Sequence, residues 1–107
     1  MEPDQTVVDE LVRRIVEAVH PLEIILFGSA ARGQMGSDSD LDVLVVMPEG
    51  VHRRHTAGHI YEQLFGFGFP ADVLVATPGD LQQYAENPGL IYRQVLREGK
   101  VIYRVSA

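Results

Sequence analysis

Residues 27–47 read FGSAARGQMGSDSDLDVLVVM, and this stretch decides the fold. Small residues and glycines come first, then Asp38, Asp40 and Asp42, and then a run of apolar residues. On an extended strand alternate side chains share a face, so Asp40 and Asp42 point to the same side, about 6–7 Å apart at their Cα atoms. The apolar residues between and after them point toward a core. The stretch therefore predicts a strand that begins with a pair of carboxylates, and it leaves Asp38 in the preceding turn.

The rest of the chain alternates between helical and strand patterns. Apolar residues recur at helical spacing before Pro21, and short β-compatible runs are separated by glycine and proline. The expected elements are, in chain order, a helix over 5–20, a strand over 22–27, a helical turn over 29–33, a strand over 41–47, a helix over 51–65, a strand over 71–76, a helix-initiating turn at Thr77-Pro78 with Asp80 in its first turn, helices over 81–87 and 90–99, and a strand over 100–105. The apolar face of the helix over 51–65 is expected to consist of Ile60, Tyr61, Leu64 and Phe65. This alternation predicts an α/β fold with helices packed on one small, mixed sheet.

Length and charge narrow the classes of function. The 107 residues are the usual size of one domain, so we expect a single domain over 1–107. The formal charge of −6 opposes binding to a long nucleic acid, although a mononucleotide that arrives with magnesium remains compatible with it. The chain has no cysteine, no apolar run of membrane-spanning length and no pattern of a secretory signal. We therefore expect a soluble cytoplasmic protein.

Carboxylates placed beside apolar packing need a compensating charge. They repel each other and lose hydration, so a proton, hydrogen bonds or a cation must offset the cost. Asp72 begins a second Asp-Val-Leu-Val run and, if the two strands are neighbours, joins Asp40 and Asp42. Oxygen-only ligands favour Mg²⁺, and three carboxylates can hold two such ions about 4 Å apart for phosphoryl displacement.

The glycine-serine turn supplies a second half for such a site. Gly28 follows a predicted strand, where the lack of a side chain lets a ligand approach the backbone. The amides and hydroxyl around Ser29 can hold phosphate oxygens. Arg32 either adds positive charge at the phosphates or pairs with an acidic neighbour.

With these residues in view, the chain resembles a known superfamily. The stretch GSAARGQMGSDSDLDVLVV is similar to the signature of the DNA polymerase β-like nucleotidyltransferases, which share a palm fold, and Asp72 stands where that family carries its third carboxylate. The short length and the ending IYRQVLREGKVIYR resemble the minimal nucleotidyltransferases, or MNT proteins, which are partners of HEPN-domain proteins.

The resemblance implies a function and roles for individual residues. Gly28 and Ser29 would bind the triphosphate of ATP, Asp40 and Asp42 would ligate two Mg²⁺ ions, and Asp72 would complete the second metal site and help activate the acceptor hydroxyl. The chain would be an antitoxin that transfers AMP to a tyrosine of a HEPN toxin, as a homodimer or as a hetero-oligomer with that toxin. Two alternatives stay open: an antitoxin that acts by complex formation alone, and transfer to a small molecule such as an aminoglycoside.

Other polar and aromatic residues fit simpler interpretations. His52, His55 and His59 lack a zinc-protease motif, and we interpret them as exposed helix residues. Tyr84, Tyr92 and Tyr103 fall at ordinary apolar spacings, which favours packing in the core or an interface. These residues carry no predicted chemistry.

Overall fold

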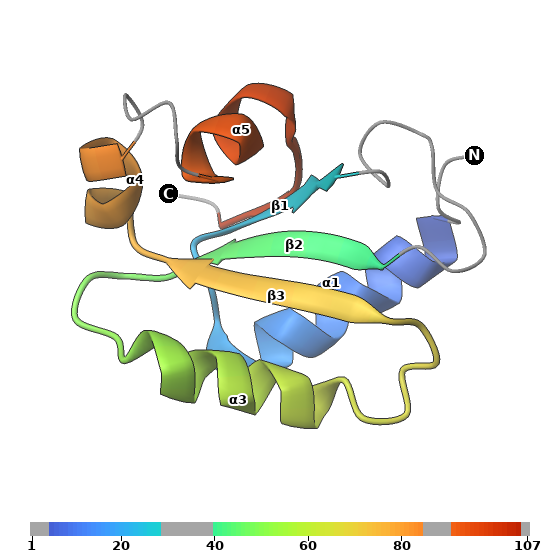
Figure 1. Cartoon of the computed structure of the whole chain (residues 1–107). Helices are drawn as coiled ribbons and strands as arrows, with labels where there is room; N and C mark the ends of the chain where they lie inside the picture. The colour runs from blue at the N-terminus through green and yellow to red at the C-terminus, as the bar shows by residue number, and fades with distance from the viewer. Residues whose placement is uncertain (1–4, 29–39, 85–90, 106–107) are drawn as a thin grey trace.

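A four-stranded mixed sheet forms the centre of the computed structural model, which describes residues 5–28, 40–84 and 91–105 (Figure 1). The elements are α1 (Gln5–Val19), β1 (Glu23–Phe27), β2 (Leu41–Val46), α3 (Arg53–Gln63), β3 (Ala71–Ala76), α4 (Pro78–Tyr84), α5 (Ile91–Glu98) and β4 (Lys100–Arg104). The strand order is β3-β2-β1-β4. β1 is antiparallel to β2 and to β4, whereas β2 and β3 are parallel. The predicted α/β class with a small mixed sheet is confirmed.

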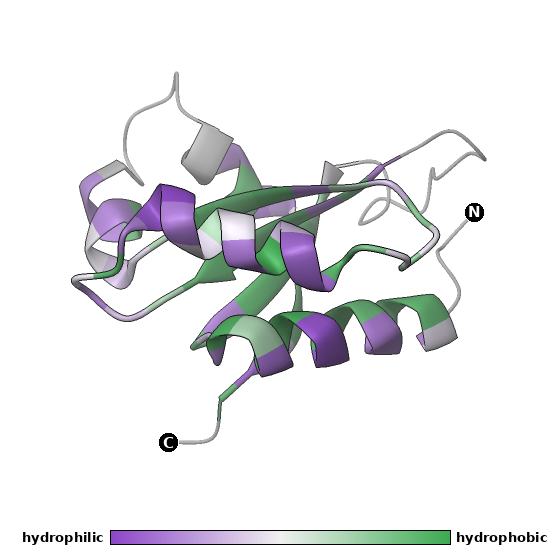
Figure 2. Ribbon diagram, turned by 90° about the horizontal axis from the view of Figure 1, so that it is seen from below, coloured by the Kyte–Doolittle hydropathy of each residue, from purple (hydrophilic) through white to green (hydrophobic). Residues whose placement is uncertain are grey.

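Helices cover both faces of the sheet. In the view of Figure 1, α1 and α3 lie below the sheet and α4 and α5 lie above it, and we call these the lower and upper faces. Figure 2, seen from below, shows hydrophilic residues on the outer sides of α1 and α3 and hydrophobic strands behind them. On the lower face, Leu11 and Ile15 of α1 and Ile60 of α3 pack against alternate residues of the strands. On the upper face, Val95 of α5 packs against the other set of strand residues.

Most predicted boundaries hold to within two residues. α1 ends at Val19 because His20 adopts a left-handed φ of 51° directly before Pro21. The helix expected over 51–65 is shorter, because His52 caps its N-terminus and the chain leaves the helix after Gln63. α4 begins at Pro78, whose fixed φ suits a first helical position, and Asp80 lies in its first turn, as expected. The turn predicted over 29–33 and the positions 85–87 lie outside the described residues.

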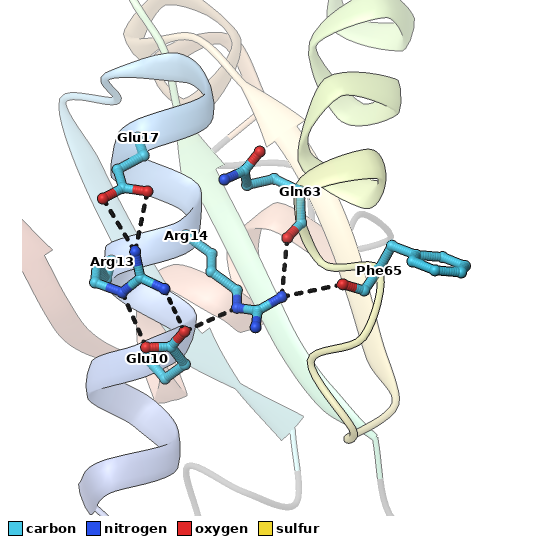
Figure 3. Close-up of polar contacts among 6 residues, drawn as sticks. All are labelled: Glu10, Arg13, Arg14, Glu17, Gln63 and Phe65. Carbon is cyan, nitrogen blue, oxygen red and sulfur yellow. Dashed lines mark hydrogen bonds and ion pairs between the residues drawn. The ribbon is translucent and has the colours of Figure 1, made fainter.

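Arg14 fastens α1 to the end of α3 (Figure 3). Its Nη1 donates hydrogen bonds to the carbonyl oxygens of Gln63 and Phe65, each 3.1 Å long, and its Nε donates to Glu10. The guanidinium also lies over the ring of Phe67, 5.6 Å from its centroid. These contacts fix where the chain turns from α3 back toward β3.

Among the described residues, no helix is long and apolar enough to cross a membrane.

Candidate functional site

The pairing of β2 with β3 places two of the predicted carboxylates side by side. The parallel register sets Asp42 opposite Asp72, and neighbouring strands are about 4.8 Å apart. Leu41 and Val43 are fully buried in the lower core, so alternation directs Asp42 to the upper face. Asp42 is half-buried there, whereas Asp72 is exposed. The condition under which Asp72 joins the other carboxylates, that its strand is a neighbour of β2, is therefore met.

Asp40 joins this pair from the residue directly before β2. Burial raises the pKa of Asp40, and so do a hydrogen bond to the Asp72 carboxyl and the negative charge of that group. Burial also raises the pKa of Asp42, together with the charges of Asp72 and Asp40. The three side chains therefore form one electrostatic cluster with too much negative charge for its surroundings. Such a cluster favours the binding of protons or cations, because either reduces the repulsion between the carboxylates.

The donor chemistry of the cluster suits a hard cation. Carboxylate oxygens are the only ligands it offers, and Mg²⁺ commonly uses one or two carboxylates and takes its remaining ligands from water and phosphate. In the described part of the chain, no group of three or more His, Cys, Asp or Glu is arranged so that it could hold a metal ion. The carboxylate oxygens of Asp40, Asp42 and Asp72 are nevertheless donors of the kind that Mg²⁺ uses. The site for two ions that we expected stays a prediction.

Gly28 contacts the cluster from the end of β1. The antiparallel register sets Phe27 opposite Asp42, and Gly28 follows directly with a left-handed φ of 71°. A Cβ atom at this position would collide with Oδ2 of Asp42. Glycine is thus favoured by the backbone conformation, and any larger residue would displace the carboxylate of Asp42. Ser29, Arg32 and Asp38 lie outside the described residues, so their predicted roles stay predictions.

A surface hollow of about 350 Å³ adjoins the carboxylates. Its lining residues come from β1, β2, β3 and α3: Phe27, Asp42, Tyr61, Asp72, Val73 and Leu74. The sequence missed Tyr61, because the helical pattern assigned it to an apolar face. In the structure its side chain is 45% exposed, and its hydroxyl accepts a hydrogen bond of 2.9 Å from the backbone N–H of Val73. The hydrogen bond between Tyr61 and Val73 depends on the position of β3 at the edge of the sheet, which the sequence pattern did not identify.

Residues near the start of α3 have a structural explanation. Nδ1 of His52 accepts a hydrogen bond from the backbone N–H of His55, and the two rings stack with their centroids 3.8 Å apart. Arg53 pairs with Asp80 at 2.5 Å. Hydrogen bonds from Thr77 and Arg53 lower the pKa of Asp80, although burial alone would raise it. These contacts join α3 to α4 at the end of the sheet away from the carboxylates.

Comparison with known proteins gives a family match over most of the chain. A family profile described as "Nucleotidyltransferase domain" matches residues 8–102. No curated protein matches the chain.

Two solved structures share the fold. One is a Sulfolobus solfataricus protein assigned as a nucleotidyltransferase, with 19% identity and a TM-score of 0.64 over 92% of this chain and 78% of that one. The other is a toxin-antitoxin structure with AMP-PNP, with 16% identity and a TM-score of 0.69 over 92% of this chain and 74% of that one. At such low identity the likeness concerns the fold alone.

Proposed function

The chain belongs to the nucleotidyltransferase domain family, and from this premise we propose that it transfers AMP from ATP to a tyrosine hydroxyl of a HEPN-domain toxin and so acts as that toxin's antitoxin. The observation that carries the proposal is the pairing of Asp42 with Asp72 across parallel strands, with Gly28 packed against Asp42. This arrangement offers carboxylates for a metal beside a glycine where a phosphate tail can approach. The toxin-antitoxin structure with AMP-PNP, an analogue of ATP, supports a toxin as the partner and ATP as the donor.

Each residue has a defined role in this proposal. Asp40 and Asp42 hold magnesium, which neutralises charge on the triphosphate when it is bound. Gly28, with Ser29 and Arg32 after it, binds the phosphate tail. Asp72 contributes to the metal site and accepts the proton of the attacking hydroxyl.

The reaction is an in-line displacement at the α-phosphorus of ATP. A bond forms between the acceptor oxygen and the α-phosphorus, and the bond between that phosphorus and the bridging oxygen to the β-phosphate breaks. Pyrophosphate leaves with the electron pair of the broken bond, and the hydroxyl proton passes to Asp72. The protein forms no covalent bond to the nucleotide in this reaction, so positioning and charge neutralisation provide most of the acceleration.

The test uses ATP labelled in its α-phosphate, magnesium and the purified protein that is encoded beside this chain. We expect the neighbouring protein to become labelled, and Asp42→Asn to lower the rate by about 10²–10³-fold, as the loss of one charge-stabilising group does. Asp9→Asn is the matched control, because Asp9 is an exposed residue of α1, on the other face of the sheet. Equal labelling by wild type and Asp42→Asn would exclude the assignment of these carboxylates.

Protection by complex formation alone is the second candidate. Its support is the likeness in fold to a toxin-antitoxin structure, because such a pair can act by association alone. Survival of cells that express the toxin distinguishes the two. If Asp42→Asn abolishes labelling but still protects the cells, binding suffices and catalysis is dispensable.

A further inference from the structure

Tyr61 is the polar side chain of the hollow that the proposed chemistry does not use. It comes from α3, which packs on the lower face, yet it reaches the edge of the sheet beside the carboxylates of the upper face. We propose that Tyr61 positions the acceptor, as a hydrogen-bond donor and a packing surface for a polypeptide that enters the site across the β3 edge. This inference rests on the proposed function and adds the direction from which the acceptor arrives.

The first step of the argument is the backbone of β3. This strand lies at the edge of the sheet and pairs with β2 on one side. The carbonyl of Pro70 and that of Ala76 bond toward β2, so by alternation the N–H of Val73 points away from the sheet. Tyr61 accepts a hydrogen bond from that N–H, which fixes the phenol one residue beyond Asp72. The hydroxyl is therefore held by the same strand that carries the proposed base.

The second step concerns the proton of the phenol. The oxygen of Tyr61 accepts from Val73, and a hydroxyl can also donate one hydrogen bond. Within the described part of the chain, no hydrogen bond from this hydroxyl to an acceptor is found. Tyr61 is 45% exposed and lines the hollow. A carbonyl or hydroxyl oxygen of an incoming chain is the kind of partner this donor fits.

The third step is the shape of the hollow. Phe27 and Asp42 line it on the side of β1, next to Gly28, while Asp72 and Tyr61 line it at the β3 edge. The donor nucleotide in the proposed function lies against Gly28. The acceptor hydroxyl must attack from the opposite side of the α-phosphorus, which is the side of Asp72 and Tyr61. An aromatic ring at this position also suits a tyrosine acceptor, since aromatic pairs pack favourably.

The experiment measures transfer to the acceptor protein of the labelling assay at varied acceptor concentrations. Tyr61→Phe keeps the ring and removes the hydroxyl. We expect KM for the acceptor to rise about five- to tenfold, the effect of one hydrogen bond, while kcat and the Kd for magnesium-ATP change less than about twofold. Partial unfolding would lower the active fraction and hence kcat, and would leave KM unchanged. The pattern therefore separates positioning from a structural role.

Tyr103→Phe is the matched control. Tyr103 is a half-buried residue of β4, at the opposite edge of the sheet, and its loss of a hydroxyl should leave KM for the acceptor unchanged. If wild type labels the acceptor and Tyr61→Phe has the same KM, the inference about Tyr61 is wrong and the proposed function stands. If wild type labels no acceptor, the proposed function fails and this inference fails with it.

Discussion

Replacing Gly28 by alanine should damage the site more than the fold. The backbone at Gly28 has a φ of 71°, where a side chain costs about 1–2 kcal/mol. The added Cβ also collides with Oδ2 of Asp42, which must then turn away from its rotamer at a cost of about 0.5–1.5 kcal/mol. A smaller entropy of the unfolded chain offsets about 0.4–1 kcal/mol of this. The net loss is about 1–2.5 kcal/mol.

The assay combines calorimetry with nucleotidyl transfer. For a chain of this length each kcal/mol lowers Tm by about 4 °C, so Gly28→Ala should melt about 4–10 °C below wild type and remain folded at room temperature. Transfer should fall by about 10²-fold, because the carboxylate must move by about 1 Å and misplacement on this scale costs that much. Nucleotide binding should weaken in parallel.

Gly66→Ala separates the two effects. Gly66 has a similar φ of 80°, but a Cβ atom there would meet nothing within 4 Å. This variant should lose about 0.5–1.5 kcal/mol from backbone strain and keep its transfer rate. A folded Gly28→Ala variant that transfers as fast as Gly66→Ala would refute the reasoning, because the contact with Asp42 would then have no functional consequence.

Two further predictions concern stability. Arg14→Ala should cost about 1–3 kcal/mol in urea denaturation, because Arg14 donates hydrogen bonds to the carbonyl of the last residue of α3 and to that of Phe65 after it (Figure 3). Arg13→Ala loses only exposed ion pairs and should cost under about 1 kcal/mol; equal losses would contradict the assigned roles. Burial and the negative charge of Asp72 raise the pKa values of Asp40 and Asp42, so the native state holds their protons more tightly than the unfolded chain does. Their stabilising contribution is complete below the ordinary pKa of 3.8 and is lost as the pH rises through the raised values. In magnesium-free buffer, urea denaturation should therefore find Asp40→Asn/Asp42→Asn more stable than wild type at neutral pH, with an advantage that shrinks on acidification; a more stable wild type at neutral pH would disprove this.

The sequence predicted the parts of the fold that depend on local periodicity. The alternation over β2 assigned Leu41 to the core and Asp42 to the opposite face, and burial in the structure agrees. The contact of Asp72 with Asp42 was expected only on the condition that their strands are neighbours, and the parallel pairing of β2 with β3 meets that condition. A period of two residues thus predicts the face on which a side chain lies, but not the order of the strands.

The sequence could not reveal features that depend on strand order. Tyr61 was assigned to an apolar helix face together with Ile60 and Phe65, but only Ile60 is buried, and Phe65 is 91% exposed. The role of Tyr61 follows from the position of β3 at the edge of the sheet, which leaves the N–H of Val73 in need of a partner. Edge position depends on the order of all strands in the sheet, so the pattern of residues within the helix cannot predict it.

The electrostatics of the carboxylate cluster connect its stability with its use. A domain that needed only a stable strand would place no second carboxylate opposite Asp42, because burial and repulsion already disfavour the charged form of that group. Val95 of α5 packs with Ile25 and Leu44 on the upper face, while Asp42 and Asp72 lie near the beginning of β2 and β3. The unfavourable charge is thus confined to the one end of the sheet where Gly28 admits a ligand. A cation with its bound phosphates would relieve the repulsion there. Binding of this ligand should therefore stabilise the folded state, which the repulsion between the carboxylates destabilises.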